Sequence, residues 1–486
     1  QIQRKFNRPV EAIQINEYDL KQALAVGFGK GEESEEDGVY NIDTTSEFSF
    51  QERDVKQLVN ATIASAFKRN ASDIHIEVYR DTVDVRYRID GVLHKFPTPI
   101  HKDNIEDVIN RIRVMCRPEL DITERRVPQD GRITIRRRAG RARKLVTLRV
   151  ALNPGPYGID CVLRVLDETN TFRLSDIGLR ASAFEKFNNL IRSPQGLFLV
   201  TGPTGSGKST TMYSIISELN THENKIMSVE DPVERTFPGV NQRQISSSMS
   251  FADYVRSFLR QDPDIIFIGE IRDGETAEIA TRAAQTGHLV VSTLHTNDAT
   301  SAVSRLVSLG VERYLIESSI LGVLAQRLLR KVCLNCIDEY QPEERYRKFL
   351  EAVGCSISTF LRGMGCEQCD GTGYRGRLGI FELFVVDEEI RDMIIRGVSD
   401  GEIRRRAIAK GMKTLVQDAI EQIAACRTTV EELFRTVSYA QIVAHTNAMR
   451  PVLDVPIQRP EPPEDPFDLE LLGDIPIEDL EDASKV

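Results

Sequence analysis

Apolar residues follow two different patterns along this chain of 486 residues, and the change comes near residue 170. In the first part, apolar residues at helical spacing between Arg53 and Lys68 are followed by segments in which apolar and polar residues alternate. These segments are 73–77, 83–89, 91–95, 132–136, 145–150 and 160–166. Because alternation with a period of two is typical of strands that bury one face, we expect a small α/β domain here.

Beyond residue 170, short continuous apolar runs alternate with segments of helical length. The runs are 197–200, 226–229, 265–268 and 289–293. Strands that are apolar on both faces and alternate with helices are typical of a parallel sheet covered on both sides. After Gly379 we expect the chain to become helical. Ser399 and Thr428 are each followed three residues later by glutamate, which is the spacing of a helix capping box.

The composition is that of a globular protein. Hydrophobic residues make up 41% and charged residues 28% of the chain, and no apolar run approaches the roughly 18–20 residues of a membrane-spanning helix. We find no signal peptide, and because the chain begins with Gln1 we expect an upstream segment. Of the net charge of −10, residues 461–486 contribute −9, with ten acids and one lysine. The rest is nearly neutral, which argues against a globally basic nucleic-acid-binding surface.

A phosphate-loop pattern, GxxxxGK[ST], lies at residues 202–209. Its glycines allow backbone N–H groups to surround phosphate oxygens, Lys208 would reach the terminal phosphates, and Ser209 would hold Mg²⁺. An apolar strand precedes the loop, and a helix whose N-terminus favours anions follows it. The alternative is a chance match. The nucleotide-binding residues predicted from this pattern are Gly202, Pro203, Thr204, Gly205, Ser206, Gly207, Lys208, Ser209 and Thr210.

Charged or titratable side chains follow the other expected strands of this sheet. The second strand runs into Glu230 and Glu234, the third into Glu270, and the fourth lies between His288 and His295. Parallel sheets bind ligands at the carboxyl ends of their strands, and phosphoryl transfer to water needs a carboxylate that positions the water. Glu270 stands where a Walker B acid belongs. Taken singly, each acid is also compatible with a helix cap or a solvated loop, and His295 with a structural role.

Four of the eight cysteines form two pairs with two residues between the members, Cys333 with Cys336 and Cys366 with Cys369. Four thiolates in two such pairs suit tetrahedral Zn²⁺ in a closed, structural site. The 29 residues between the pairs exceed the usual gap of about 15–20, and we expect residues 343–353 to fill part of the gap with a helix. A redox pair or unrelated free thiols are the alternatives.

Two groups of arginines lie in the first domain. The run from Arg136 to Lys144 would suit nucleic-acid phosphates, but it lacks interleaved aromatic residues and is interpreted as a solvated hairpin turn. Arg149 and Arg164 differ, because each lies in an apolar strand and needs a partner. A neighbouring subunit's γ-phosphate would serve, since an arginine supplied in trans stabilises transition-state charge. A salt bridge within the small domain is the rival interpretation.

The set of motifs resembles the secretion ATPases that power type II secretion and type IV pilus assembly. The resemblance runs from about Phe50 to Tyr439, and the Gly269-Glu270 form of Walker B is normal in that family. The motifs that carry it are ASDIHIE (71–77), RYRIDG (86–91), PQDGR (128–132), the phosphate loop, EDPVE (230–234), RQDPD (260–264), GEIRD (269–273), GH (287–288), HTND (295–298) and GTGYRGR (371–377).

The resemblance implies a hexameric ATPase ring on the cytoplasmic face of the inner membrane. ATP, Mg²⁺ and Zn²⁺ would be its cofactors, and a membrane platform and cytoplasmic docking proteins its partners, with no nucleic acid. The four-cysteine element favours the assembly or secretion branch over retraction. The implied fold is α/β, with a small PAS-like N-terminal domain and a RecA-like ATPase domain that carries a zinc-binding insertion and C-terminal helices.

The resemblance also assigns roles to site residues. Glu270, with Glu234 as the more favoured of the two aspartate-box glutamates Glu234 and Glu230, would handle metal and water. His288 and His295 would line the site, and Arg149 and Arg164 would reach the nucleotide. Two other classes remain open: a DNA-translocating motor, whose hydrolysis DNA would stimulate, and an ATP-stabilised scaffold that hydrolyses little.

The expected domain order combines the patterns with the resemblance. It comprises a remnant of an N-terminal domain (1–28), a linker (29–50), a second N-terminal α/β domain (51–170), a RecA-like ATPase core (171–330), the zinc insertion (331–370), a C-terminal helical part (371–445) and an acidic, proline-rich tail expected to be disordered (446–486).

Overall fold

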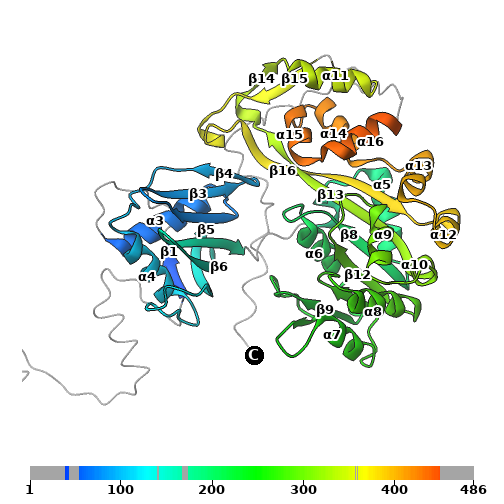
Figure 1. The fold of residues 1–486 in the computed structure, drawn as a ribbon, viewed down its shortest axis with the longest axis horizontal. Coiled ribbons are helices and arrows are strands. Elements are labelled where there is room, and N and C mark those ends of the chain that lie inside the picture. The colour runs from blue at the N-terminus through cyan, green and yellow to red at the C-terminus, as the bar shows by residue number, and fades with distance from the viewer. Residues whose placement is uncertain are drawn as a thin grey trace, which may run out of the picture. The chain divides into compact units, whose positions relative to one another are not determined.

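The computed structural model describes residues 39–42, 54–139, 142–166, 173–355, 357 and 359–448. The chain divides into two compact units, Gln1–Asn170 and Thr171–Val486, and each is described by itself (Figure 1). The expected N-terminal remnant lies outside the described residues, as does the acidic tail from residue 449 onward.

The first unit contains a seven-stranded sheet in the order β1-β5-β6-β7-β2-β3-β4. Helices α3 and α4 contact each other and the sheet, and alternate strand residues such as Ile74, Ile76 and Leu163 are buried in the shared core. The elements are β1 (Val39–Ile42), α3 (Val55–Lys68), β2 (Asp73–Val78), β3 (Val83–Ile89), β4 (Val92–Lys95), α4 (Ile105–Met115), β5 (Gln129–Ala139), β6 (Ala142–Gly155) and β7 (Gly158–Leu166).

Two features of this unit differ from the sequence expectation. The linker expected over residues 29–50 contains a strand, β1, which pairs in parallel with β5 and buries Tyr40 and Ile42. The acidic, glycine-rich composition that suggested a linker ends at Gly38, and an alternating run follows it. Helix α4 was not predicted, although its residues Ile105, Val108, Ile109 and Ile112 recur at helical spacing and are buried.

The second unit contains a seven-stranded sheet in the order β10-β9-β11-β12-β8-β13-β16. All neighbouring pairs are parallel except β13 and β16, so the sheet ends on an antiparallel edge strand. The strands are β8 (Gly196–Thr201), β9 (Ile226–Glu230), β10 (Asn241–Gln244), β11 (Ile265–Ile268), β12 (Leu289–Leu294), β13 (Ile320–Val332) and β16 (Tyr374–Val385).

Helices cover both faces of this sheet, because its central strands are apolar on both sides. Along β8, Leu197 and Leu199 belong to one core cluster, whereas Phe198 and Val200 belong to another. Helices α5 (Ala181–Ile191) and α6 (Lys208–Leu219) contribute to the second cluster. Those on the first are α7 (Phe251–Phe258), α8 (Gly274–Gln285), α9 (Ser301–Ser308) and α10 (Arg313–Ser319). The predicted α/β fold class is thus confirmed.

The C-terminal part differs in detail from the expectation. Gly379 lies inside β16, and the next helix begins only at Glu388, because β13 and β16 pair over most of their length. Ser399 caps its helix as predicted, but the Thr428 capping box is wrong: the helix is capped at Thr429, and the Thr428 hydroxyl donates to the carbonyl of Arg330 at 2.8 Å. The remaining elements are η1 (Leu174–Ile177), η2 (Leu334–Cys336), β14 (Ile337–Tyr340), α11 (Glu344–Ala352), β15 (Phe360–Gly363), η3 (Glu367–Cys369), α12 (Glu388–Ile395), α13 (Asp400–Ala409), α14 (Leu415–Ala424), α15 (Val430–Thr436) and α16 (Tyr439–Ala448).

Candidate functional site

The phosphate loop joins the carboxyl end of β8 to the first turn of α6. Gly202, Gly205 and Gly207 have φ angles of 152°, 77° and 90°, in the region that favours glycine. A Cβ at Gly202 would lie 2.5 Å from Ser206 Oγ and 2.7 Å from the carbonyl oxygen of Gln326. The glycine therefore allows the backbone to turn tightly, while Ser209 and Thr210 are exposed in the first turn of α6.

Lys208 is folded back onto its own loop. Its Nζ donates to the carbonyl oxygens of Gly202 at 2.7 Å and Pro203 at 3.1 Å, and it makes no ion pair with any described residue. Burial lowers the pKa of Lys208 to about 8, since desolvation disfavours the charged form. An anionic group in the loop would add to the attraction of the nearby Glu270 carboxylate, which already favours the charged form of this amine.

Gln326 supports the loop from β13, and sequence reasoning missed it. Its Nε2 donates to the carbonyl of Ser206 at 2.8 Å, and its Oε1 accepts from the Thr211 hydroxyl at 2.8 Å. Gln326 is buried, so both of its polar groups are satisfied by the loop and α6. The signal was present as a polar residue within the apolar run ILGVLAQRLL.

Glu270 and His295 meet beside Lys208 at the carboxyl ends of β11 and β12. His295 Nε2 lies 3.5 Å from Glu270 Oε2, and Arg272 donates to the same carboxylate. Burial, followed by the nearby positive charge of Lys208, lowers the pKa of His295. The neighbouring strands therefore bring together three predicted site residues, a lysine, a carboxylate and an imidazole, around the phosphate loop.

The two aspartate-box glutamates have different environments. Glu230 is buried and accepts hydrogen bonds from Tyr213 at 2.7 Å, Ser228 at 2.7 Å and Gln242 at 2.9 Å. Glu234 is half-buried, and its backbone N–H donates to Tyr213 Oη at 3.3 Å. Three side chains thus hold the carboxylate of Glu230 in place.

His288 lies at the other end of the parallel strands from the phosphate loop. The N–H of Gly196, the first residue of β8, donates to the carbonyl of His288 at 3.0 Å, whereas the phosphate loop follows the last residue of β8. A strand of that length spans roughly 20 Å. The structure therefore does not bring His288 to the phosphate loop of the same chain, because residues that bracket a strand lie at its two ends.

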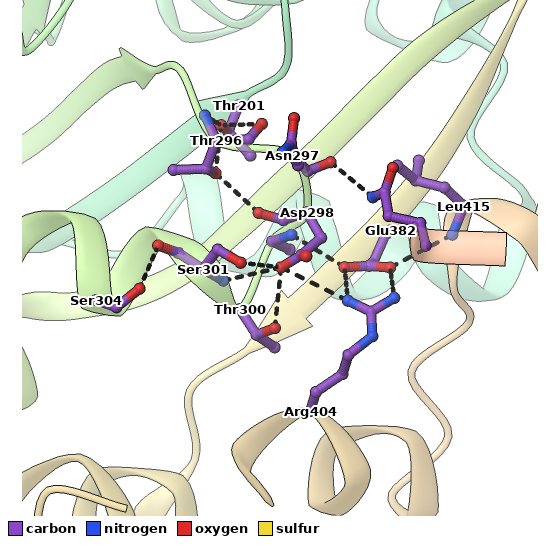
Figure 2. A network of polar contacts seen from close by, with 12 residues as sticks. Thr201, Thr296, Asn297, Asp298, Thr300, Ser301, Ser304, Glu382, Arg404 and Leu415 are labelled. Atoms are coloured by element: carbon purple, nitrogen blue, oxygen red, sulfur yellow. Dashed lines mark hydrogen bonds and ion pairs between the residues drawn. The ribbon is translucent and has the colours of Figure 1, made fainter. Parts of the chain in front are cut away.

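A polar network ties the turn after β12 to β8 and to the C-terminal helices (Figure 2). The hydroxyls of Thr201, at the end of β8, and Thr296 are 2.7 Å apart, and Thr296 also donates to the carbonyl of Asp298 at 2.8 Å. Arg404 lies 3.6 Å from the Asp298 carboxylate and donates to both oxygens of Glu382 at 3.0 and 2.8 Å. The turn that carries His295 is thus held from two sides.

Glu382 is the buried centre of this network. It is fully buried in β16 and also accepts from the N–H groups of Ala299 at 2.9 Å and Leu415 at 3.4 Å. Burial raises the pKa of Glu382, against the opposing effect of Arg404. The pair joins β16, α13 and the start of α14 to the turn after β12, a connection that spans sequence separations no local pattern could reveal.

In the first unit, Arg149 and Arg164 are exposed and lie directly opposite each other on β6 and β7. The row continues to Arg132 on β5 and to Asp73 on β2. Arg164 Nε donates to Asp73 Oδ1 at 2.8 Å, which is the internal salt bridge that the sequence left open. Arg149 makes no ion pair within the described residues. Like charges placed directly opposite are destabilising, so this face favours an anionic partner.

The four paired cysteines converge. Their sulfur atoms all lie within 4.8 Å of one another, and the pairs Cys333–Cys366, Cys336–Cys369 and Cys366–Cys369 are separated by 3.8, 3.9 and 3.7 Å. Tetrahedral Zn²⁺ with Zn–S bonds of about 2.3 Å implies S···S separations of about 3.8 Å. The donor set and its spacing therefore fit Zn²⁺, and helix α11 lies between the pairs as expected.

A family model described as Type II/IV secretion system protein matches residues 50–435. The chain belongs to this family. Among its relatives, the type IV pilus assembly ATPase PilB of Thermus thermophilus is 45% identical over 398 residues, which are 81% of this chain and 44% of PilB. The type II secretion system protein HxcR of Pseudomonas aeruginosa is 46% identical over 384 residues, 78% of this chain and 77% of HxcR.

One solved structure with a similar fold supports this assignment. The pilus retraction motor PilT with bound ADP superposes with a TM-score of 0.50 at 26% identity, and the match covers 80% of this chain and 96% of PilT. The resemblance drawn from the motifs is thus confirmed at the level of the family. Among the described residues, no helix has the length and apolar character needed to cross a bilayer.

Proposed function

We propose that this chain is the ATP-hydrolysing subunit of a hexameric ring that powers protein export or pilus assembly. The observation that carries the proposal is the meeting of Lys208, Glu270 and His295 at the ends of neighbouring parallel strands, around a phosphate loop. Membership of the secretion family supports the coupling to export or assembly. The subunit would act at the cytoplasmic face of the inner membrane through a membrane platform and docking proteins, without nucleic acid.

In this proposal different residues of the second unit bind the phosphates of ATP, hold Mg²⁺ and orient the attacking water. The loop 202–210 and Lys208 bind the phosphates, and the exposed Ser209 hydroxyl with Glu270 supplies the hard oxygen donors that Mg²⁺ prefers. Bound Mg²⁺ would neutralise charge on the phosphates. Glu270 and Glu234 would orient the attacking water, and His295, whose pKa is lowered by burial and by Lys208, would sense the γ-phosphate. In this proposal His288 has no role at the nucleotide site of its own chain.

The arginine row of the first unit completes the site in a neighbouring subunit. Arg149 has no ion-pair partner among the described residues and faces Arg164 across the sheet. A phosphate oxygen held by another subunit would relieve this repulsion, and an arginine acting in trans can accelerate phosphoryl transfer by about 10³–10⁵-fold. Arg132, which the sequence reasoning left without a role, extends the same row.

The zinc site in this proposal is structural. Cys333, Cys336, Cys366 and Cys369 would supply all four ligands of Zn²⁺, so no position remains open for substrate. The site would hold the segment between β13 and β16 in shape, because the cysteine pairs lie just beyond the end of one strand and just before the start of the other. This element could present a surface to the membrane platform.

The test is Mg-ATP hydrolysis per mole of chain over a wide range of protein concentration, with Glu270→Gln as the blank. A specific activity that rises with concentration is expected, because sites are completed between subunits. Mixing Arg149→Gln with Lys208→Ala chains should restore part of the activity. In a mixed ring, the intact Lys208 of an Arg149→Gln chain can meet the intact Arg149 of a neighbouring Lys208→Ala chain. Arg80→Gln, which removes a charge from an exposed turn of the same unit, should behave as the parent chain.

Three experimental outcomes would contradict the proposal or a part of it. Absence of hydrolysis at any concentration, with ATP still bound, would favour the scaffold class and overturn the motor. Hydrolysis that rises strongly with added DNA would favour a DNA-translocating motor. Recovery on mixing that is no greater than the sum of the separate variants would overturn the role of Arg149 in trans.

A further inference from the structure

The carbonyl oxygen of Asn297 accepts hydrogen bonds from two elements that are distant in the sequence. Asn297 lies in the turn between β12 and α9, two residues after His295. Arg327 Nη2, from β13, donates to this oxygen at 2.7 Å, and Gln441 Nε2, from α16, donates to it at 2.9 Å. Both donating side chains are buried. A single backbone carbonyl therefore joins the turn that carries His295 to β13 and to α16.

The bond from Arg327 belongs to the sheet. Its Nη1 donates to the carbonyl of Gln326 at 2.9 Å, and the Gln326 side chain supports the phosphate loop from the same strand. Since β13 lies beside β8, and the phosphate loop follows β8, this donor has a fixed place next to the loop. The support from β13 thus depends only on the sheet.

The bond from Gln441 depends instead on the start of α16. Its Oε1 accepts from the hydroxyl of Ser438 at 3.0 Å and from the N–H of Ser438 at 3.4 Å, and Ser438 directly precedes the first residue of α16. A backbone carbonyl can only accept, so the amide nitrogen has to face Asn297. Both ends of the Gln441 amide are therefore used, and its orientation is determined by its partners.

A second contact holds α16 on the same unit. His445 Nδ1 lies 3.0 Å from the hydroxyl of Thr414, which also caps α14 by accepting from the N–H of Gln417 at 3.2 Å. Ile442 is buried in the core of this unit. The match to the family model ends at residue 435, before α16 begins. The contact of α16 with the turn after β12 is thus a feature that the family match does not cover.

The His295 side chain has little else to hold it. Within the part of the chain that the structure describes, its ring pairs with Glu270 alone, at 3.5 Å, and 51% of the side chain is exposed. Because so few side-chain contacts hold the ring, its place beside Glu270 is set by the backbone of the turn. A donor that fixes the carbonyl two residues further on therefore bears on the position of His295.

We propose that Gln441 is a positioning residue of the ATP site. By holding the Asn297 carbonyl, α16 fixes the turn that places His295 beside Glu270. This inference rests on the proposed function, which gives His295 its role at the γ-phosphate. Without the amide donor, the carbonyl keeps one of its two bonds and the turn can shift. A misplacement of about 1 Å can lower the rate of a reaction by about 10²-fold.

The test replaces Gln441 by methionine, which has a similar length but no donor. We expect Gln441→Met to lower kcat at least about fivefold, because the turn is less well placed. The affinity for ATP should change little, since the phosphate loop is untouched. Hydrogen exchange at residues 296–301 should become faster. Gln417→Met is the control, because the half-buried Gln417 side chain makes no hydrogen bond within the described residues, and it should behave as the parent chain.

A milder variant covers the case in which Gln441→Met does not fold. Ser438→Ala removes the hydroxyl that orients the Gln441 amide, at an exposed position. It should lower kcat and speed exchange at residues 296–301 in the same direction, by smaller factors.

A double-variant comparison separates positioning of His295 from a general loss of structure. If Gln441 acts through His295, adding Gln441→Met to a His295→Ala chain should lower kcat by less than about twofold, because residues that act together are not additive. An equal loss with and without His295 would overturn the inference, and so would unchanged exchange at residues 296–301 in Gln441→Met. A parent chain that hydrolyses no ATP would contradict the proposed function instead, and the exchange comparison would still test the contact with α16.

Discussion

Arg404 of α13 donates to both carboxylate oxygens of Glu382, which is fully buried in β16. Removing one member of a buried ion pair leaves an uncompensated charge and costs about 3–5 kcal/mol. Arg404→Met should therefore lower the free energy of unfolding of the second unit by this order, measured by urea unfolding followed by circular dichroism. The double variant Arg404→Met/Glu382→Gln should recover part of the loss, since glutamine keeps an acceptor for the N–H of Ala299.

A matched control lies next to Arg404 on the same helix. Arg405 is exposed and makes no ion pair within the described residues, so Arg405→Met should change the free energy of unfolding little. If Arg404→Met and Arg405→Met lower the free energy of unfolding by the same amount, the ion pair of Arg404 with Glu382 stabilises the unit no more than an exposed arginine does.

Lys208 should take up a proton when ATP binds. Its pKa is lowered to about 8 by burial, so above pH 8 a large part of the amine is neutral, and phosphates nearby favour the charged form. Calorimetry at pH 8.5 in two buffers of different ionisation enthalpy would measure the uptake. Lys208→Arg should show less uptake, because arginine stays charged at this pH. Equal uptake by both chains would place the titrating group elsewhere.

Glu270→Gln should still bind ATP and should lose hydrolysis. Because a positioned base typically contributes about 10²–10⁴-fold, we expect a fall in kcat of at least about 100-fold with little change in nucleotide affinity. Phosphate release and a fluorescent ATP analogue would measure the two quantities. Glu278→Gln, on the exposed face of α8 and paired with Arg282 at 2.7 Å, is the control. Turnover retained in Glu270→Gln would contradict its assigned role.

Cys366→Ser should lose about one zinc ion per chain, because it removes one of four ligands whose sulfurs lie within 4.8 Å of one another. Elemental analysis of the purified chain would measure it. Cys355→Ala removes a buried thiol outside the cluster and should leave the zinc content unchanged. An unchanged content in Cys366→Ser would refute the four-cysteine site.

Local patterns in the sequence were enough for the parts of the site that a single segment contains. The strand, loop and helix over 197–219 could be read directly, because one continuous run carries the apolar strand, the glycines and the following helix. The convergence of the cysteine pairs was also predictable, since metal-ligand spacing implies it. The roles of the site residues stay predictions, and so do the domain boundaries.

Tertiary structure decided the rest. Gln326 supports the phosphate loop from 120 residues away, and Arg404 reaches Glu382 from another element. His288 and His295 looked alike in sequence, but β12 places them at opposite ends of a strand. By itself, the sequence determined the apolar strands over 197–200, 226–229, 265–268 and 289–293, the phosphate loop and the family, because each depends on neighbouring residues. Which distant side chains meet depends on strand order, here β13 beside β8, and no local pattern encodes that order.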